Sequence, residues 1–438
     1  MNMNTDRHSF DSLSYSLWGL FALTILSGAF LLVYYVPSFS QAFASAEKLN
    51  SQVPFGWMVR RLHAAGGSFL LLLLFIHLLR VFCAGAYKNR PGRFWLAEVF
   101  LVAFAVWAAY TGSFLPLSQE AFWGTAASLA GLSGIPWIGG GLVDFLRGGK
   151  ELGGAALSRF FSLHLLFAAG IGLLMFGHSR MRGRGGEGEE RPSGFGNLLT
   201  SAAVAVLLLA AVTFAPHWFA DSLREAGNPA GNPSGIVGPW PMMFFQEALS
   251  YLGAASPFWF LTGLILVKLL VLFLPYYDRA PERNLLLRPF SLVVGSGLLA
   301  LILYFTFLGM AGAHYGERAV LAVQPASARE VRGAQVYLEK NCAFCHQVFG
   351  KEGRREGPDM AVVLQRGRSA EWVQRFIMNA RLYQPGTTMP KYDLPLDDLE
   401  ALRVYLLALN PAKRKFEVVE RSALMELGAF GVWGDEKK

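Results

Sequence analysis

The chain has 438 residues, of which 53% are hydrophobic and 16% are charged. This composition is too apolar for an ordinary soluble protein of that length and is typical of a membrane protein, whose lipid-facing surface needs no charge. The formal net charge is +8, but the Lys and Arg residues are scattered through short loops and form no basic stripe with interleaved aromatic residues. We therefore expect no nucleic-acid partner.

Seven apolar runs are long enough to cross a bilayer, which takes about 20 helical residues. In chain order, the predicted spans cover residues 17–36, 64–81, 94–116, 160–177, 198–214, 258–275 and 291–310. The polar segment before the first span has no small-residue cleavage site after a short apolar core. We therefore expect the first span to remain as a membrane anchor.

The regions outside these spans differ in composition. The loop Leu117–Ser158 is rich in glycine and moderately apolar, which predicts short helices at the membrane interface. From about Ser327 charges become frequent, and three segments with helical periodicity predict a small soluble helical domain. These segments are 329–338, 370–380 and 396–409. The tail Lys413–Lys438 has a mixed composition without a functional interpretation.

Basic residues in the loops predict the orientation. Loops 82–93, 179–197 and 276–290 share a side with the N-terminus and are richer in Lys and Arg for their length than the loops opposite. The positive-inside rule places this side in the cytoplasm. Because the number of spans is odd, the C-terminal domain is then expected on the periplasmic side of a bacterial inner membrane.

Four histidines lie in or beside two of the predicted spans. His63 and His77 belong to the second, and His164 and His178 to the fourth. Each pair is 14 residues apart, and fourteen helical steps return to within roughly 40° of the same face, about 21 Å farther along. Two such helices packed together place a histidine pair at each of two depths, and each pair can hold a haem iron. Two matching pairs are hard to explain as unrelated polar residues facing a cavity, so we predict two haem b groups.

Three arginines accompany these histidines. Arg60 and Arg80 lie three residues from His63 and His77 respectively, and Arg159 precedes His164. Each is expected near a membrane surface, where a guanidinium can pair with haem propionates. The alternative is that these side chains extend to the interface at helix ends without binding a haem.

The C-terminal domain contains a Cys-x-x-Cys-His motif at residues 342–346. Cys342 and Cys345 are spaced to form thioethers with the two vinyl groups of one haem c, and His346 then becomes an axial ligand. A zinc or thiol redox site is the competing interpretation. Met389 follows at a distance suited to the second axial ligand, and a His/Met pair suits electron delivery. Met360 competes for this role, but its segment is better suited to brace His346.

Several segments within residues 10–315 resemble cytochrome b of the Rieske/cytochrome bc complexes. The clearest are Phe55–Gly66 and Ser158–His164, which resemble its second and fourth helices. Other matching stretches are Phe122-Trp123-Gly124, Ile135-Pro136-Trp137-Ile138-Gly139, Phe214-Ala215-Pro216 and Arg288-Pro289. Residues 327–410 resemble a class I cytochrome c.

The resemblance implies an all-α fold. It consists of a seven-helix transmembrane cytochrome b bundle, made of a four-helix dihaem core and a three-helix C-terminal part, and a small soluble α-helical cytochrome c domain. The implied boundaries are 1–195, 196–315, 327–412 and a tail, 413–438.

The same resemblance implies roles for the histidines. His63 and His164 would hold the outer, low-potential haem b, and His77 and His178 the inner, high-potential haem b.

The family carries electrons from quinol to a c-type cytochrome. The resemblance therefore implies a cytochrome b–c fusion subunit of a respiratory quinol:cytochrome c oxidoreductase, with quinol/quinone as substrate. A Rieske cluster needs two cysteines and two histidines, and this chain has only one cysteine, Cys83, outside the Cys-x-x-Cys-His motif. The implied partners are thus a separate Rieske iron–sulfur protein, a downstream c-type cytochrome or oxidase, and a second copy in a homodimer.

Some positions depart from the family pattern. Where the family has Pro-Glu-Trp-Tyr at its outer quinol site, this chain has Gly238-Pro239-Trp240-Pro241. The glutamate that takes the quinol proton is therefore missing. Glu247 and Glu120 are the candidate substitutes for it, and Trp240 is the other candidate residue of the outer quinol site. The Lys-Asp pair of the inner site is Gly196-Asn197, and a family glycine at the start of the third span is Glu98.

These departures motivate a second hypothesis. The chain would be a non-bifurcating dihaem b/haem c membrane conduit that links the quinone pool to a partner reductase or dehydrogenase. A third hypothesis, a structural subunit without turnover, is opposed by the complete set of ligand residues.

Overall fold

The fold is known from a computed structural model that describes most of the chain. The described residues are 3–89, 92–133, 137–149, 152–182, 194–214, 223–228, 240–252, 257–279, 282, 287–311, 317–323, 327–352, 357–361, 368–384, 387 and 389–429. The all-α prediction is confirmed, with the addition of one small two-stranded sheet.

The elements before residue 312 are all helical in the described part of the chain. They are α1 (Met3–Tyr34), α2 (Ala42–Gln52), α3 (Gly56–Cys83), η1 (Ala86–Asn89), α4 (Gly92–Phe114), α5 (Gln119–Ser133), α6 (Gly139–Arg147), α7 (Gly154–Arg182), α8 (Gly194–Phe214), α9 (Trp240–Leu252), α10 (Pro257–Leu272), α11 (Leu274–Tyr277) and α12 (Pro289–Ala311).

Five of these helices are long and apolar enough to cross a membrane. Their spanning segments are Ser16–Tyr34, Gly56–Cys83, Gly92–Phe114, Gly154–Met181 and Ser291–Ala311. The other two predicted spans coincide with α8 and α10, which have 21 and 16 residues. The chain is therefore a membrane protein.

Two helices begin before the apolar runs that predicted them. α3 starts at Gly56 and α7 at Gly154, because polar and charged residues continue the helices beyond the apolar stretch. His63, which precedes its predicted span, consequently lies within α3, and His178 lies within α7 because that helix continues to Arg182.

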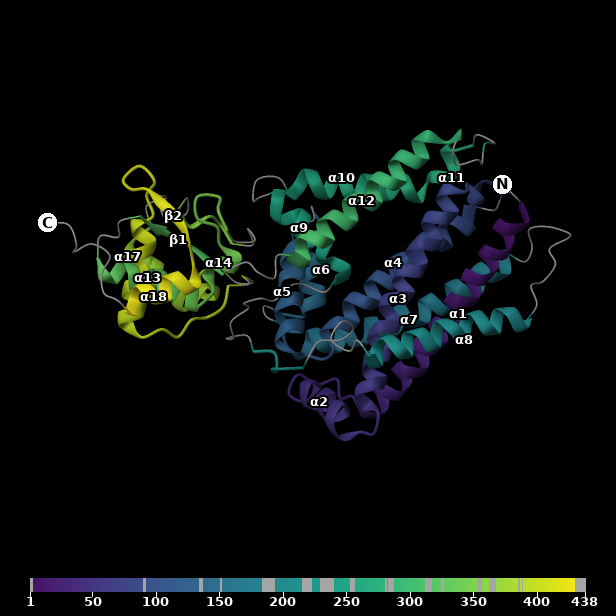
Figure 1. Cartoon of the computed structure of the whole chain (residues 1–438), viewed down its shortest axis with the longest axis horizontal. Helices are drawn as coiled ribbons and strands as arrows, with labels where there is room; N and C mark the ends of the chain where they lie inside the picture. Colours follow the sequence, from purple (N-terminus) through teal and green to yellow (C-terminus); the bar gives the residue numbers. More distant parts are fainter. Residues whose placement is uncertain are drawn as a thin grey trace. The chain divides into compact units, whose positions relative to one another are not determined.

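Helices α1, α3, α4 and α7 run side by side (Figure 1). α4 packs against α7 and α3, α1 packs against α3, and α8 covers α1 and α3. The buried residues Leu20, Leu74, Leu101 and Ile171 join one helix to the next in a shared core. Both histidine-bearing helices, α3 and α7, therefore have α4 as a neighbour.

Short helices occupy the loop between the third and fourth predicted spans, as expected. α5 packs against α6, and α5 also packs against α9. In α6, Val143 and Leu146 are buried and Phe145 is exposed, which gives this helix the two-faced character of an interfacial segment.

A buried polar network joins the end of α3 to the segment before α12. Asp278 accepts hydrogen bonds from Tyr87 and Arg288, and its carboxylate lies 2.8 Å from Nζ of Lys88. Burial alone raises the pKa of Asp278, but the hydrogen bonds from Lys88 and Tyr87 outweigh it, so the net pKa is lowered. Arg288 also donates to the carbonyl oxygens of Phe82 and Cys83. Arg288, a landmark of the predicted C-terminal half, thus stabilises the end of α3.

The C-terminal domain is helical around a compact core. Its elements are β1 (Arg318–Ala322), α13 (Ala328–Glu339), α14 (Cys342–Cys345), α16 (Ala370–Met378), η5 (Ala380–Leu382), α17 (Leu396–Ala408), β2 (Phe416–Glu420) and α18 (Arg421–Ala429). α13 and α17 meet at Gly333, where an added Cβ would lie only 2.1 Å from the carbonyl oxygen of Ala401. This backbone contact requires glycine.

The segment after residue 412 has a structural role that local periodicity did not reveal. β2 pairs antiparallel with β1, with Ala322 opposite Phe416. Leu424 of α18 is buried, and its carbonyl oxygen accepts a hydrogen bond from Gln335 of α13. The described part of the tail therefore completes the C-terminal domain.

We predict that Gly333→Ala destabilises the C-terminal domain by about 1–3 kcal/mol, because the extra methyl group overpacks the α13–α17 contact. Thermal unfolding of the purified chain, followed by visible absorption of the covalent haem, measures the effect. Arg329→Ala, on the exposed side of α13, is the control and should unfold like the wild type. Equal unfolding midpoints for both variants would contradict the proposed contact.

Candidate haem-binding site

His63 of α3 and His164 of α7 face each other within the bundle. Their ring centroids are 6.0 Å apart, with the rings 76° from parallel. An iron held by two imidazoles sits about 2 Å from each ligating nitrogen. The separation of the rings therefore suits one iron between them.

Backbone carbonyl groups fix the orientation of this pair. Nδ1 of His63 lies 3.0 Å from the carbonyl oxygen of Thr24, and Nδ1 of His164 lies 2.9 Å from that of Ala108. A carbonyl oxygen only accepts, so each Nδ1 must carry the proton. Nε2 of each ring is left with its lone pair free for a metal, which is the usual arrangement around metal-binding histidines.

Two glycines make room for these rings. A Cβ on Gly28 of α1 would lie 2.8 Å from Cε1 of His63, and one on Gly112 of α4 would lie 2.7 Å from Cε1 of His164. The helices on either side of the pair thus approach it without side chains. Together with the free Nε2 atoms, this space fits a haem.

The second pair, His77 and His178, lies one histidine spacing farther along the same helices. The ring centroids are 5.8 Å apart and 85° from parallel. Both residues are buried, with 3% and 7% of their surfaces exposed. The ring of Phe94 stacks on His178 at 4.6 Å. Ligand type and spacing again suit one iron held by two imidazoles.

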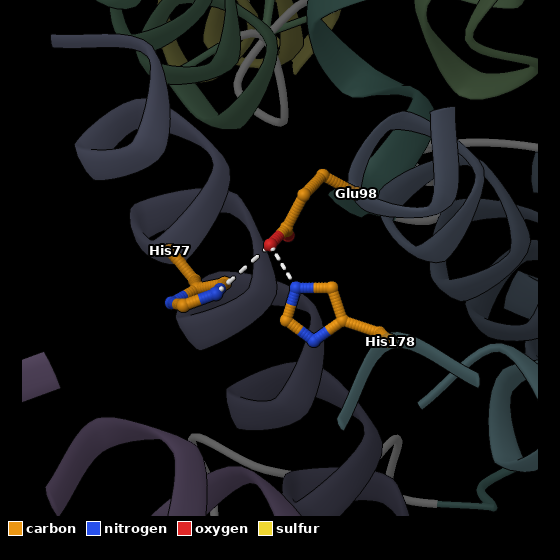
Figure 2. Close-up of side chains that lie close together, drawn as sticks. All are labelled: His77, Glu98 and His178. Carbon is orange, nitrogen blue, oxygen red and sulfur yellow. Dashed lines mark ion pairs between the residues drawn. The ribbon is translucent and has the colours of Figure 1, made fainter. Parts of the chain in front are cut away.

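Glu98 distinguishes this inner pair from the outer one. Its Oε1 lies 3.0 Å from Nε2 of His77 and 2.6 Å from Nε2 of His178 (Figure 2). Glu98 comes from α4, is 1% exposed, and directs its carboxylate between the two rings. This is the region an iron would occupy, so the inner pair fits a haem only after the carboxylate moves aside. Two histidines and one carboxylate also form a ligand set for a non-haem metal ion.

In the C-terminal domain, the Cys-x-x-Cys-His motif forms α14 and the residue after it. Nδ1 of His346 lies 2.8 Å from the carbonyl oxygen of Pro358, and the amide of Gly357 donates to the carbonyl oxygen of Cys345. Asp359 accepts from the amides of Phe349 and Gly350. The segment after Gly357 therefore orients His346, with its Nε2 available for an iron.

Cys342 lies in surroundings that keep its thiol neutral. Burial raises the pKa of Cys342 to about 12, so this side chain is a thiol at neutral pH. Zinc and thiol redox sites use thiolates with lowered pKa values. The raised pKa of Cys342 thus argues against a thiol redox site, and the histidine that directly follows Cys345 favours haem over zinc.

Both candidate methionines, Met389 and Met360, pack against the domain core. The amide of Met360 donates to the carbonyl oxygen of Gln347, which fastens its backbone to the motif. The amide of Met389 bonds only locally, to the hydroxyl of Thr387. Met389 therefore lies in a segment that is separate from the Cys-x-x-Cys-His motif.

The remaining predicted site residues are spread over several helices. Arg60 lies on α3 and donates to Asn50, while Arg80 and Arg159 are partly buried near the ends of α3 and α7. Trp240 begins α9, and Glu247 on the same helix is 1% exposed. Glu120 begins α5, the helix that packs against α9. Gly238 and Pro239 lie outside the described residues, and Gly196 and Asn197 are described only by their place in α8.

Periodicity missed the groups that hold the histidines. The carbonyl oxygens of Thr24 and Ala108 carry no sequence signal, because every residue has one. Gly112 could have been found from the sequence, since it lies 14 residues after Glu98, the same spacing as in the histidine pairs.

We predict that Gly28→Ala and Gly112→Ala each remove about half of the haem b, because the new methyl group would collide with a ligand ring of the outer pair. The measurement is the ratio of haem b to haem c in pyridine haemochrome spectra. Gly67→Ala on α3 is the matched control, since nothing lies within 4 Å of a Cβ at that position. A normal ratio in both test variants would rule out a haem between His63 and His164.

Comparison with known proteins agrees with this geometry. Residues 6–182 match the cytochrome b/b6/petB family, and residues 330–410 match the cytochrome c family. The chain is 33% identical over 243 residues to cytochrome b of Schizosaccharomyces japonicus, a match that covers 52% of this chain. It spans 62% of that relative's length, which is less than two thirds.

A solved structure titled hyperthermophilic respiratory complex III has the same fold, with a TM-score of 0.59 and 24% identity over 68% of this chain and 83% of that chain. The chain therefore joins, in one polypeptide, an N-terminal domain of the cytochrome b/b6 family and a C-terminal domain of the cytochrome c family.

Proposed function

We propose that this chain is the cytochrome b–c fusion subunit of a bc-type quinol:cytochrome c oxidoreductase. The observation that carries the proposal is the presence of two histidine pairs at two depths of one helix bundle, in the same chain as a Cys-x-x-Cys-His domain. When bound, two haem b groups and one haem c supply one-electron transfer between a quinol and an acceptor.

The histidines of the bundle hold and orient the haem b groups in this proposal. His63 and His164 bind the outer group, and His77 and His178 bind the inner one. Hydrogen bonds from Nδ1 to a backbone carbonyl strengthen a ligating imidazole as a base and prevent it from rotating. Arg60, Arg80 and Arg159 neutralise the propionates near the two membrane surfaces.

In the C-terminal domain, Cys342 and Cys345 attach the haem c, and His346 and Met389 bind its iron. The contact of His346 with Pro358 supports its role as the fixed ligand. Binding by one thioether and one imidazole would raise the reduction potential of the haem c, which suits a group that receives electrons from quinol.

Glu247 is the residue we assign to accept a quinol proton. Its side chain is buried on α9, seven residues after Trp240, and a buried carboxylate beside a quinone pocket can act as a general base. Glu120 is the second choice, on the helix that packs against α9.

The proposal includes an arrangement in the membrane and a set of partners. The N-terminus lies in the cytoplasm of a bacterial cell and the cytochrome c domain in the periplasm. A separate Rieske iron–sulfur protein, a c-type cytochrome or oxidase, and a second copy of the chain complete the complex. The proposed boundaries are 1–195, 196–315 and 327–412.

A non-bifurcating conduit is the second candidate. Trp240-Pro241 at the start of α9 favours it, because the glutamate of the family's outer-site motif is absent there. The two candidates differ in a direct measurement. With quinol present, a pulse of oxidant increases haem b reduction in a bifurcating complex that contains a Rieske centre, and it only oxidises haem in a conduit.

We predict that Glu247→Gln slows quinol oxidation by roughly 10²-fold or more, because the proton loses its acceptor. The rate of haem reduction by a synthetic quinol measures the effect, and full reduction by dithionite checks that the haems are present. Glu225→Gln, at an exposed position, should react at the wild-type rate. A wild-type rate for Glu247→Gln with a slow Glu120→Gln would assign the proton to Glu120 instead.

A further inference from the structure

The outer and inner histidine pairs are related by a shift of 14 residues, and the shift extends to α4. Fourteen residues separate His63 from His77 on α3 and His164 from His178 on α7. The same number of residues separates Glu98 from Gly112 on α4. Gly112 lies against His164, while Glu98 lies against His178 and His77. The same place beside the two ligand pairs thus carries no side chain at the outer site and a carboxylate at the inner site.

The position of Glu98 keeps its charge near the inner site even when a haem is bound. Its backbone belongs to the middle of the second turn of α4, whose neighbours Phe94, Trp95, Ala97 and Leu101 are buried. A haem between His77 and His178 would displace the carboxylate from between the rings. The side chain would remain within a few ångströms of the haem, because α4 is packed against both α3 and α7.

We propose that Glu98 lowers the reduction potential of the inner haem b. The inference rests on the proposed binding of a haem between His77 and His178. A carboxylate beside the iron stabilises the ferric state, which carries one more positive charge than the ferrous state. Burial strengthens this effect, since little water surrounds Glu98 to screen it.

A lower potential of the inner haem would change how electrons are distributed between the two b haems. The resemblance to cytochrome b implies that the inner haem has the higher potential of the two. Glu98 would lower the potential of the inner haem, whereas Gly112 leaves the outer haem without a corresponding charge. The difference between the two reduction potentials would therefore become smaller. Electrons would then be shared more evenly between the two haems than in a bundle with glycine at both positions.

The test is a spectroelectrochemical titration, at fixed pH, of the full-length purified chain and its Glu98→Gln and Glu98→Gly variants. We expect the midpoint potential of one haem b to rise in both variants. The rise should correspond to a roughly tenfold or larger increase in the equilibrium constant for reduction of that haem. The other haem b and the haem c should not change. Glu98→Asp keeps the charge and should restore most of the low potential, whereas a purely steric role predicts no such rescue.

Glu47→Gln, which removes an exposed carboxylate on α2, is the control for a general charge effect and should leave all potentials unchanged. Unchanged potentials in Glu98→Gln and Glu98→Gly, with two haem b per haem c, would overturn this inference and leave the proposed function intact. Fewer than two haem b in the wild-type chain, with zinc or non-haem iron bound instead, would overturn the proposed inner haem and this inference with it.

Discussion

The arrangement of the N-terminal part depends on bringing four imidazole rings together inside an apolar helix bundle. Burying such polar rings is costly unless each finds a partner. At the outer pair, backbone carbonyl groups of α1 and α4 provide partners for Nδ1 of His63 and His164. The glycines on those helices provide space. The four helices therefore act as one unit, in which α1 and α4 position the ligands that α3 and α7 carry.

The two pairs are alike in spacing and different in surroundings. The outer pair faces glycine and has its Nε2 atoms free, which prepares it for an iron. The inner pair faces Glu98, whose carboxylate holds both rings in the structure (Figure 2). In the C-terminal domain, Pro358 gives His346 the same kind of carbonyl partner. In both the outer pair and the Cys-x-x-Cys-His motif, Nδ1 of each histidine thus contacts a backbone carbonyl oxygen. In the inner pair, a carboxylate contacts Nε2 of both rings instead.

Much of this was predictable from sequence, because local patterns carry it. Apolar length predicted membrane-spanning helices, and a spacing of 14 residues predicted two histidine pairs at two depths. The resemblance to cytochrome b implied which histidines meet. The pairing of β1 with β2 was not predictable, since residues about one hundred positions apart form it and each strand has only five residues. Glu98 stood out as an unusual charge near the inner site. That its carboxylate lies between two Nε2 atoms depends on the rotation of α4 against α3 and α7, which periodicity does not determine.

The most direct test of the central claim is haem stoichiometry in the purified chain, from pyridine haemochrome spectra and reduced-minus-oxidised difference spectra. We expect two haem b and one covalent haem c per chain, all reducible by a quinol. One haem b, or none, would contradict the assignment of the two histidine pairs and with it the proposed transfer of electrons from quinol.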